Sequence, residues 1–123
     1  MRIEAGKSWY SPNPPLTVAV ADLEHPVVER EKAAVTIKID EPHVRVVEYR
    51  FPPGGETGWH RHGFDYVVVP MRDGKLLLEE AGGGSRIAEL RTHQPYARRA
   101  GVEHNVINAN EYEFAFLEIE ILR

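Results

Sequence analysis

Three histidines in the sequence are spaced so that they could hold one metal ion. His60 and His62 are separated by a single residue and precede the apolar run at residues 67–69. Because side chains at positions i and i+2 of a strand point to the same face, the two imidazoles would project together. Two imidazoles rarely hold a metal by themselves, and His104, in another strand-like stretch, is the best candidate for a third ligand. Neutral imidazole binds zinc, iron, nickel and copper, and three of them leave positions open for water, oxygen or substrate.

The residues that follow His62 leave two arrangements open. Strict alternation places Phe64, Tyr66 and Val68 on the face of the histidines and turns Asp65 to the outer face. A bulge would instead bring Asp65 inward as an alternative ligand. Beside a metal, Tyr66 could hydrogen-bond to a bound ligand or act as a catalytic acid, its unperturbed pKa being about 10. The competing interpretation is a core tyrosine with a satisfied hydroxyl.

The elements that must position these residues are predicted to be strands almost throughout. Residues 34–40 alternate between apolar and polar side chains, and residues 43–51 are rich in β-branched and aromatic types. Residues 71–80 predict a hairpin with Asp73-Gly74 as its turn. Short strands with turns every 8–12 residues or so favour a sandwich or barrel.

The last segment alternates with a change of phase. Phe114 and Phe116 share one parity, whereas Leu117, Ile119 and Ile121 share the other. We expect a bulge near Phe116–Leu117, because it would place both sets of side chains inside.

Composition limits the classes of function. The chain has 123 residues, which predicts a single domain spanning 1–123, with residues 1–15 and their three prolines as an N-terminal arm. A net charge of −4 without a basic stripe argues against nucleic acid as a partner. There is no cysteine, so thiolate sites are excluded. No signal-peptide core and no apolar run near the ~20 residues of a membrane span is present, so we expect no membrane partner and a cytoplasmic protein.

Two segments carry a family resemblance. The chain resembles a small single-domain cupin of the RmlC-like type, which implies an all-β double-stranded β-helix, or jelly-roll barrel. Its first motif, residues 54–74, matches at Gly54, His60, His62 and a slightly late Gly74, and its second, residues 93–108, matches at three positions. Those three positions are Gly101, His104 and Asn108. The resemblance covers residues 44–122 and implies a metal held by the three histidines.

The sequence departs from the cupin motifs at three positions. Tyr66 stands where the family keeps a glutamate ligand, Arg99 replaces a proline, and His93 replaces the opening glycine of the second motif. The pattern is similar to the three-histidine non-haem iron enzymes of the family, such as cysteine dioxygenase and the acetylacetone-cleaving dioxygenase. It also resembles small cupins attached to amino-acid catabolic gene sets.

The resemblance implies one divalent transition metal per chain, with iron expected first and zinc, nickel, manganese or copper as alternatives. It suggests a dioxygenase-like enzyme acting on a small carboxylated or dicarbonyl metabolite. The rival interpretations are a non-catalytic small-molecule-binding or sensing cupin, and a structural dimer module with a vestigial site. A homodimer is the oligomer that the family leads us to expect.

Four aromatic residues are expected to line the substrate pocket: Phe64, Tyr96, Phe114 and Phe116. The three phenylalanines could equally be core residues. Arg98 and Arg99 could clamp a carboxylate, or they could be a solvated basic pair.

Overall fold

The computed structural model describes residues 29–123, so the expected N-terminal arm at residues 1–15 lies outside the described residues. Strands joined by turns and loops make up the described part of the chain, and no helix occurs in it. The strands are Ala34–Glu41 (β1), Val44–Phe51 (β2), His60–Arg61 (β3), Asp65–Pro70 (β4), Gly74–Glu80 (β5), Ser85–Leu90 (β6), Tyr96–Arg98 (β7), Glu103–Asn108 (β8) and Phe114–Ile121 (β9).

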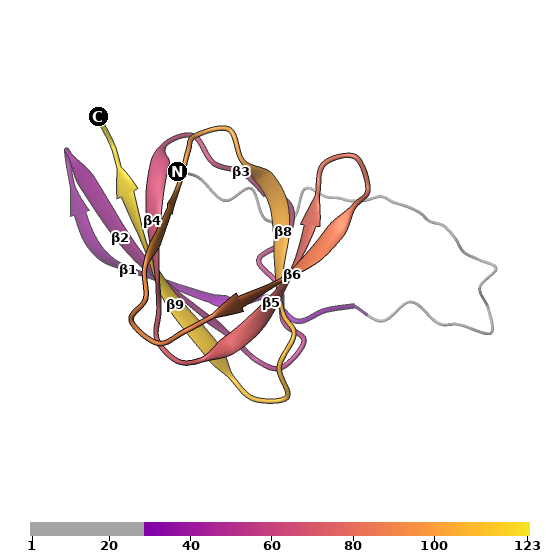
Figure 1. Cartoon of the computed structure of the whole chain (residues 1–123). Helices are drawn as coiled ribbons and strands as arrows, with labels where there is room; N and C mark the ends of the chain where they lie inside the picture. Colours follow the sequence, from indigo (N-terminus) through magenta and orange to yellow (C-terminus); the bar gives the residue numbers. More distant parts are fainter. Residues whose placement is uncertain (1–28) are drawn as a thin grey trace, which may run out of the picture.

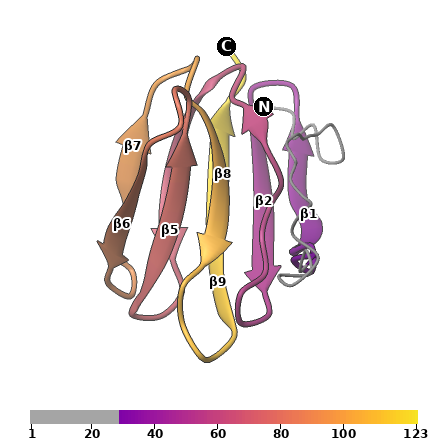
Figure 2. The ribbon, with the colours of Figure 1, turned by 90° about the vertical axis from the view of Figure 1, so that its right-hand side faces the viewer.

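The strands form two antiparallel sheets that face each other. The larger has the order β1-β2-β9-β4-β7 and the smaller the order β3-β8-β5-β6. Figure 1 shows the two sheets on opposite sides of the molecule, and in Figure 2 the strands of both run close to vertical. This architecture confirms the predicted all-β jelly-roll barrel. Of its two shortest strands, β3 carries His60 and β7 lies at the edge of the larger sheet beside β4.

The turn at residues 71–73 joins strands of different sheets. β4 pairs with β7 and β9, whereas β5 pairs with β6 and β8. The hairpin predicted over residues 71–80 is therefore wrong, because the chain crosses between the sheets at this point. Asp73 does not close a two-residue turn; its carboxylate accepts hydrogen bonds from the backbone nitrogen and the hydroxyl of Thr92, at 2.8 and 3.1 Å.

Strand β9 alternates regularly along its whole length. Its register with β2 and with β4 is continuous, so the bulge predicted near Phe116–Leu117 is absent. Regular pairing on both edges leaves no unpaired residue, and the alternation carries two glutamates inward. Glu118 is 4% exposed and Glu120 is fully buried. Leu117 and Ile119, by contrast, lie on the outer face and are only partly buried.

The hydrophobic core lies between the sheets, where the inward side chains of the long strands meet. Its members are Val47, Tyr49, Phe51, Tyr66, Val68, Leu76, Leu78, Leu90, Val106, Phe114 and Phe116. Gly74 at the start of β5 is needed for this packing, since a Cβ there would lie 2.7 Å from the ring of Phe114. In the part of the chain that the structure describes, no helix has the length and apolar character needed to cross a membrane.

Candidate metal centre

Strand pairing brings His60 and His104 together. β3 pairs with β8 antiparallel, and His60 lies directly opposite His104 in the register. Residues directly opposite in an antiparallel pair have side chains on the same face. Both side chains are buried, with 2% and 6% exposure, so the two imidazoles meet inside the barrel.

His62 lies just beyond β3 and is held beside β8 by the backbone. Its nitrogen donates to Val102 O and its oxygen accepts from Gly101 N, both at 2.8 Å. Gly101 has a φ of 101°, a conformation that glycine adopts readily and other residues rarely do. This glycine therefore allows the turn that places the second motif beside the first.

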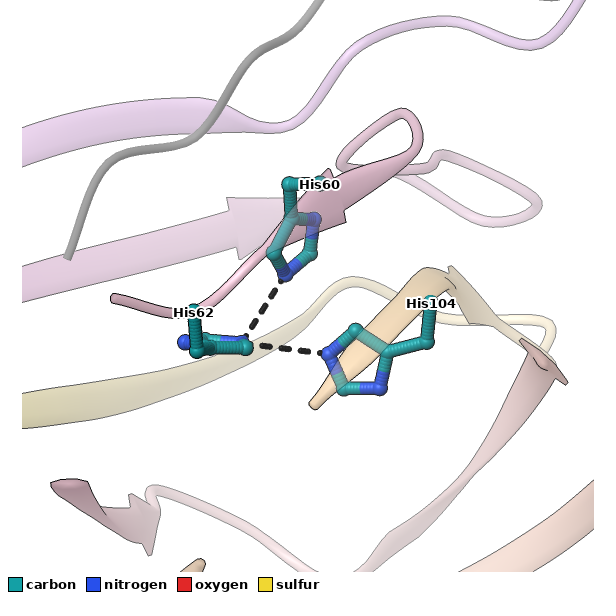
Figure 3. A group of neighbouring side chains, drawn as sticks. All are labelled: His60, His62 and His104. Atoms are coloured by element: carbon teal, nitrogen blue, oxygen red, sulfur yellow. Dashed lines mark hydrogen bonds between the residues drawn. The ribbon is translucent and has the colours of Figure 1, made fainter. Parts of the chain in front are cut away.

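The Nε2 atoms of the three imidazoles converge. His60 Nε2 lies 3.0 Å from His62 Nε2, which lies 3.2 Å from His104 Nε2. Figure 3 shows the three rings turned toward one another, with His60 and His62 on one segment and His104 on another. Metal–nitrogen bonds of about 2.0–2.1 Å put neighbouring ligand nitrogens about 3.0–3.4 Å apart, so the spacing fits one shared ion. Among the described residues, no carboxylate joins this group.

The hydrogen bonds around His60 direct its Nε2 toward the other two imidazoles. Its Nδ1 lies 2.9 Å from Gly58 O. Because a carbonyl oxygen only accepts, this contact assigns the proton to Nδ1 and leaves the Nε2 lone pair directed at the other two imidazoles. Two nitrogen lone pairs this close repel each other unless a proton or a metal cation lies between them. The donor set therefore fits a bound cation.

A buried polar network fixes the turn that carries His60. The Thr57 hydroxyl donates to Gly58 O at 2.8 Å, accepts from Val106 N at 3.1 Å, and lies 3.3 Å from His60 Nδ1. Asn105 Oδ1 accepts from Gly58 N at 2.9 Å. Such outer contacts orient a ligating imidazole. Nothing in the spacing of the motifs identified Thr57 or Asn105, because their role depends on contacts between distant segments.

The local environment keeps the imidazoles of His62 and His104 neutral, as metal binding requires. Burial, followed by the neighbouring His60, lowers the pKa of His62 to about 2. The same two causes, together with Arg98 and Arg86, lower the pKa of His104 to about 3. Both side chains therefore present lone pairs at neutral pH.

Tyr66 lies against the site without belonging to the three-histidine group. It is 2% exposed, and its ring stacks on His62 with centroids 3.8 Å apart and planes at 13°. Its hydroxyl has no hydrogen-bond partner within the described chain, and neither has Nδ1 of His62. Burial, followed by Glu118, raises the pKa of Tyr66 well above its usual range, so the hydroxyl keeps its proton. The satisfied hydroxyl expected of a core tyrosine is not observed.

The alternative in which Asp65 supplies a ligand is wrong. Asp65 is exposed, and its carboxylate accepts a hydrogen bond from Ala100 N at 2.8 Å on the outer side. The break between β3 and β4 spans residues 62–64, yet alternation resumes with Tyr66 facing inward. Phe64 falls in this break and is 37% exposed, so it does not share the buried face of Tyr66 as predicted.

The other predicted pocket residues divide between pocket and core. Tyr96 lines a pocket of about 260 Å³ beside β5, β6 and β7. Phe114 and Phe116 are almost fully buried in the hydrophobic core, where Phe116 packs against Tyr49 and Phe51. In the register of β9 with β2 they lie beside Phe51 and Tyr49, so they fill the barrel interior and do not line this pocket.

Two interior carboxyls were missed by sequence reasoning. Glu120 forms an ion pair with Arg45 at 3.4 Å. Burial raises the pKa of Glu118 to about 8, and its Oε1 has no hydrogen-bond partner among the described residues. The signal in the sequence was the regular alternation of β9, which places both glutamates on the inner face. The bulge predicted near Phe116–Leu117 hid this signal, because it was placed to bury the apolar residues of both parities.

Comparison with known proteins gives relatives of high identity. No family model matches the sequence. The β-alanine degradation protein BauB of Pseudomonas aeruginosa is 56% identical over 92 residues, which cover 75% of this chain and 96% of that protein. The crystal structure of a cupin domain from Bordetella pertussis Tohama I is 56% identical, with a TM-score of 0.75, over 77% of this chain and 98% of that one.

More distant solved structures share the fold alone. An RmlC-like cupin with a double-stranded β-helix from Methanocaldococcus jannaschii has 13% identity and a TM-score of 0.62, over 76% of this chain and 83% of its own. The jelly-roll barrel, the buried three-histidine group and the two relatives of high identity agree: the chain belongs to the cupin superfamily.

Proposed function

We propose that the chain is a mononuclear metal-dependent enzyme that acts on a small carboxylated or dicarbonyl metabolite. The observation that carries the proposal is the convergence of the three Nε2 atoms inside the barrel, at 3.0 and 3.2 Å. The group contains no carboxylate, so its ligands would leave the full charge of a divalent ion uncompensated. Such a centre favours an anionic, chelating substrate over a neutral one.

The protein's own residues have distinct roles in this proposal. His60, His62 and His104 would hold the ion, with His60 fixed by its hydrogen bond to Gly58 O. When bound, a divalent ion supplies a Lewis acid, and iron(II) additionally allows oxygen-dependent cleavage, which is the specific reaction that we propose. Tyr66 keeps its proton and offers a hydroxyl donor beside the centre.

The curated relative supports a small carboxylated substrate. Its name assigns that protein to the degradation of β-alanine, a three-carbon amino acid with one carboxylate. We propose that the present chain acts on a metabolite of the same kind, drawn from the breakdown of a β-amino acid. The proposal names a chemical class and leaves the individual compound to experiment.

The test is oxygen consumption by iron(II)-loaded protein. β-Dicarbonyl compounds, thiol amino acids and three-carbon oxo acids would be offered in turn, with substrate loss followed by mass spectrometry. We expect oxygen uptake that matches substrate loss, absent in His104→Ala and present in His43→Ala, since His43 is exposed and outside the group. Tight stoichiometric capture without turnover under any metal would instead favour a binding or sensing cupin.

A further inference from the structure

Arg98 faces the same interior as the histidines. It lies directly opposite Tyr66 in the register of β4 and β7, so the two side chains share a face. Tyr66 is buried and stacks on His62, which sets that face as the inner one. Arg98 is half-buried, whereas the next residue, Arg99, is exposed. The sequence did not distinguish these adjacent arginines, but in the structure Arg98 faces inward and Arg99 faces outward.

Arg98 also lines a pocket of a size that suits a small metabolite. The pocket has a volume of about 260 Å³. Its walls are Leu78, Arg86, Ala88, Leu90, Tyr96 and Arg98. Most binding pockets combine apolar walls with a few placed polar groups, and this one joins a short aliphatic wall to two guanidinium groups. Leu78 pairs with Val106, two residues from His104, so the pocket wall lies next to the metal centre along β8.

Only one of the two pocket arginines has a carboxylate partner. Arg86 Nε donates to Glu80 Oε2 at 2.7 Å. The guanidinium group of Arg98 forms no hydrogen bond or ion pair with any residue in 29–123. A half-buried guanidinium has lost part of its hydration, and without a counter-ion no ion pair offsets that loss. Such a group is suited to bind an anion.

The interior carboxyls do not neutralise Arg98. Glu120 belongs to β9, which pairs with β4 on the edge away from β7, and it forms an ion pair with Arg45 at 3.4 Å. Glu118 has a pKa that burial raises to about 8, so at neutral pH its carboxyl is mainly protonated. Arg98 instead lies directly opposite Tyr66, whose ring stacks on His62 with centroids 3.8 Å apart, so its charge lies near the three-histidine group.

We propose that Arg98 anchors the carboxylate of the substrate, a short aliphatic acid whose other end carries an oxygen or nitrogen that reaches the metal centre. The planar guanidinium would bind the carboxylate through two parallel hydrogen bonds. The aliphatic segment would lie along Leu78 and Leu90. This inference rests on the proposed function for the metal-bound end of the ligand, but the carboxylate anchor stands on the pocket itself.

The test uses malonate, a small dicarboxylate, as the probe and the full chain loaded with zinc(II), which is redox-inert. Calorimetry would measure malonate affinity for the wild type, Arg98→Gln, Arg98→Lys and the matched control Arg99→Gln. A charge-assisted hydrogen-bond pair predicts a loss of about 10- to 100-fold in Arg98→Gln, since each factor of ten is about 1.4 kcal/mol. Arg99→Gln should bind like the wild type. Arg98→Lys should lie between the two, because it keeps the charge without the fork.

Metal content and thermal unfolding of each variant keep the outcomes separate. Arg98-dependent malonate binding with unchanged zinc content supports the anchor, and failure of the neutral isostere malonamide to bind supports it further. Equal affinity in the Arg98 and Arg99 variants, or no malonate binding by folded, zinc-loaded wild type, would overturn it. If the wild type holds no metal but malonate binding still depends on Arg98, the anchor stands and the metal-dependent function fails.

Discussion

The ring of Tyr66 stacks on the imidazole of His62, with centroids 3.8 Å apart and planes inclined by only 13°. The first cupin motif keeps a glutamate ligand at this position, whereas here the tyrosine covers one face of the His62 ring. Because His62 Nδ1 has no hydrogen-bond partner among the described residues, this stacking supports the orientation of the ring on that side. A metal held by the three histidines would therefore have only neutral protein ligands, and the centre would be more positive than one with a glutamate ligand.

Removing the Tyr66 hydroxyl should separate its chemical from its structural role. Tyr66→Phe keeps the stacked ring, so metal content should stay unchanged. The metal-free variant should be equally stable, or more stable by about 1–3 kcal/mol, since a buried hydroxyl without a partner is lost. Turnover should fall at the same time. Urea unfolding, elemental analysis and oxygen uptake measure the three quantities.

The control for that variant is Tyr66→Leu, which removes both the hydroxyl and the stacked ring. It should weaken metal affinity, because His62 then loses the contact that orients it. A Tyr66→Phe variant that loses metal as completely as Tyr66→Leu would show that the hydroxyl itself supports the centre.

Thr57 offers a test of the network that supports His60. Thr57→Val is nearly isosteric but cannot bond to Gly58 O, Val106 N or His60 Nδ1. We expect about a tenfold or greater loss of metal affinity, measured by competition with a chelator, because the turn that carries His60 is loosened. Thr57→Ser retains the hydroxyl and should keep near-normal affinity. Equal affinities for the two variants would contradict a role for the hydroxyl.

Glu118 should make the stability of the metal-free protein depend on pH. Its folded pKa of about 8 lies above the usual 4.5, so the folded state binds this proton more tightly than the unfolded state. The resulting stabilisation is full below pH 4.5 and is lost as the pH rises toward 8. Glu118→Gln stays neutral, so its advantage over the wild type should grow by about 1 kcal/mol per pH unit across that window. Urea unfolding at several pH values with chelator measures this, and a difference independent of pH would mean that Glu118 is ionised in the fold.

Gly74 should tolerate no side chain, because a Cβ there meets the Phe114 ring at 2.7 Å. Gly74→Ala should lower the free energy of unfolding by about 1–3 kcal/mol through overpacking. Gly84 is the matched control, since no atom lies within 4 Å of the position that a Cβ would take there and its φ is not positive. Chemical denaturation compares them. Equal stability for the two alanine variants would show that the core yields to the methyl group.

The convergence of the three histidines could be predicted from the sequence because its signal is local. The side chains of His60 and His62 meet as their i, i+2 spacing predicts, although β3 ends at Arg61. His104 lies at the expected interval after Gly101, opposite His60. The wrong predictions concern partners along the chain that no local pattern specifies. The Asp73-Gly74 turn crosses between sheets, and β9 turns Glu118 inward because regular pairing outweighs the burial of apolar residues.

The pocket was predicted less well, for a related reason. Its walls come from the paired strands β5 and β6 of one sheet and from β7 of the other, which meet only when the barrel closes. The inward Arg98 could therefore not be told from the outward Arg99. Phe114 and Phe116 carry the composition of a pocket wall, but the register with β2 assigns them to the core. The hydrogen bonds that join Thr57 to Asn105 and to Val106 link residues 48 and 49 positions apart, which no spacing rule detects.

The measurement that tests the central claim most directly is the metal content of His104→Ala against wild type, both purified without chelators. Three converging imidazoles predict close to one transition metal per wild-type chain and almost none in the variant, with circular dichroism showing the fold retained. His43→Ala, which removes an exposed imidazole outside the group, should keep its metal. Full metal retention by folded His104→Ala would contradict the three-histidine centre.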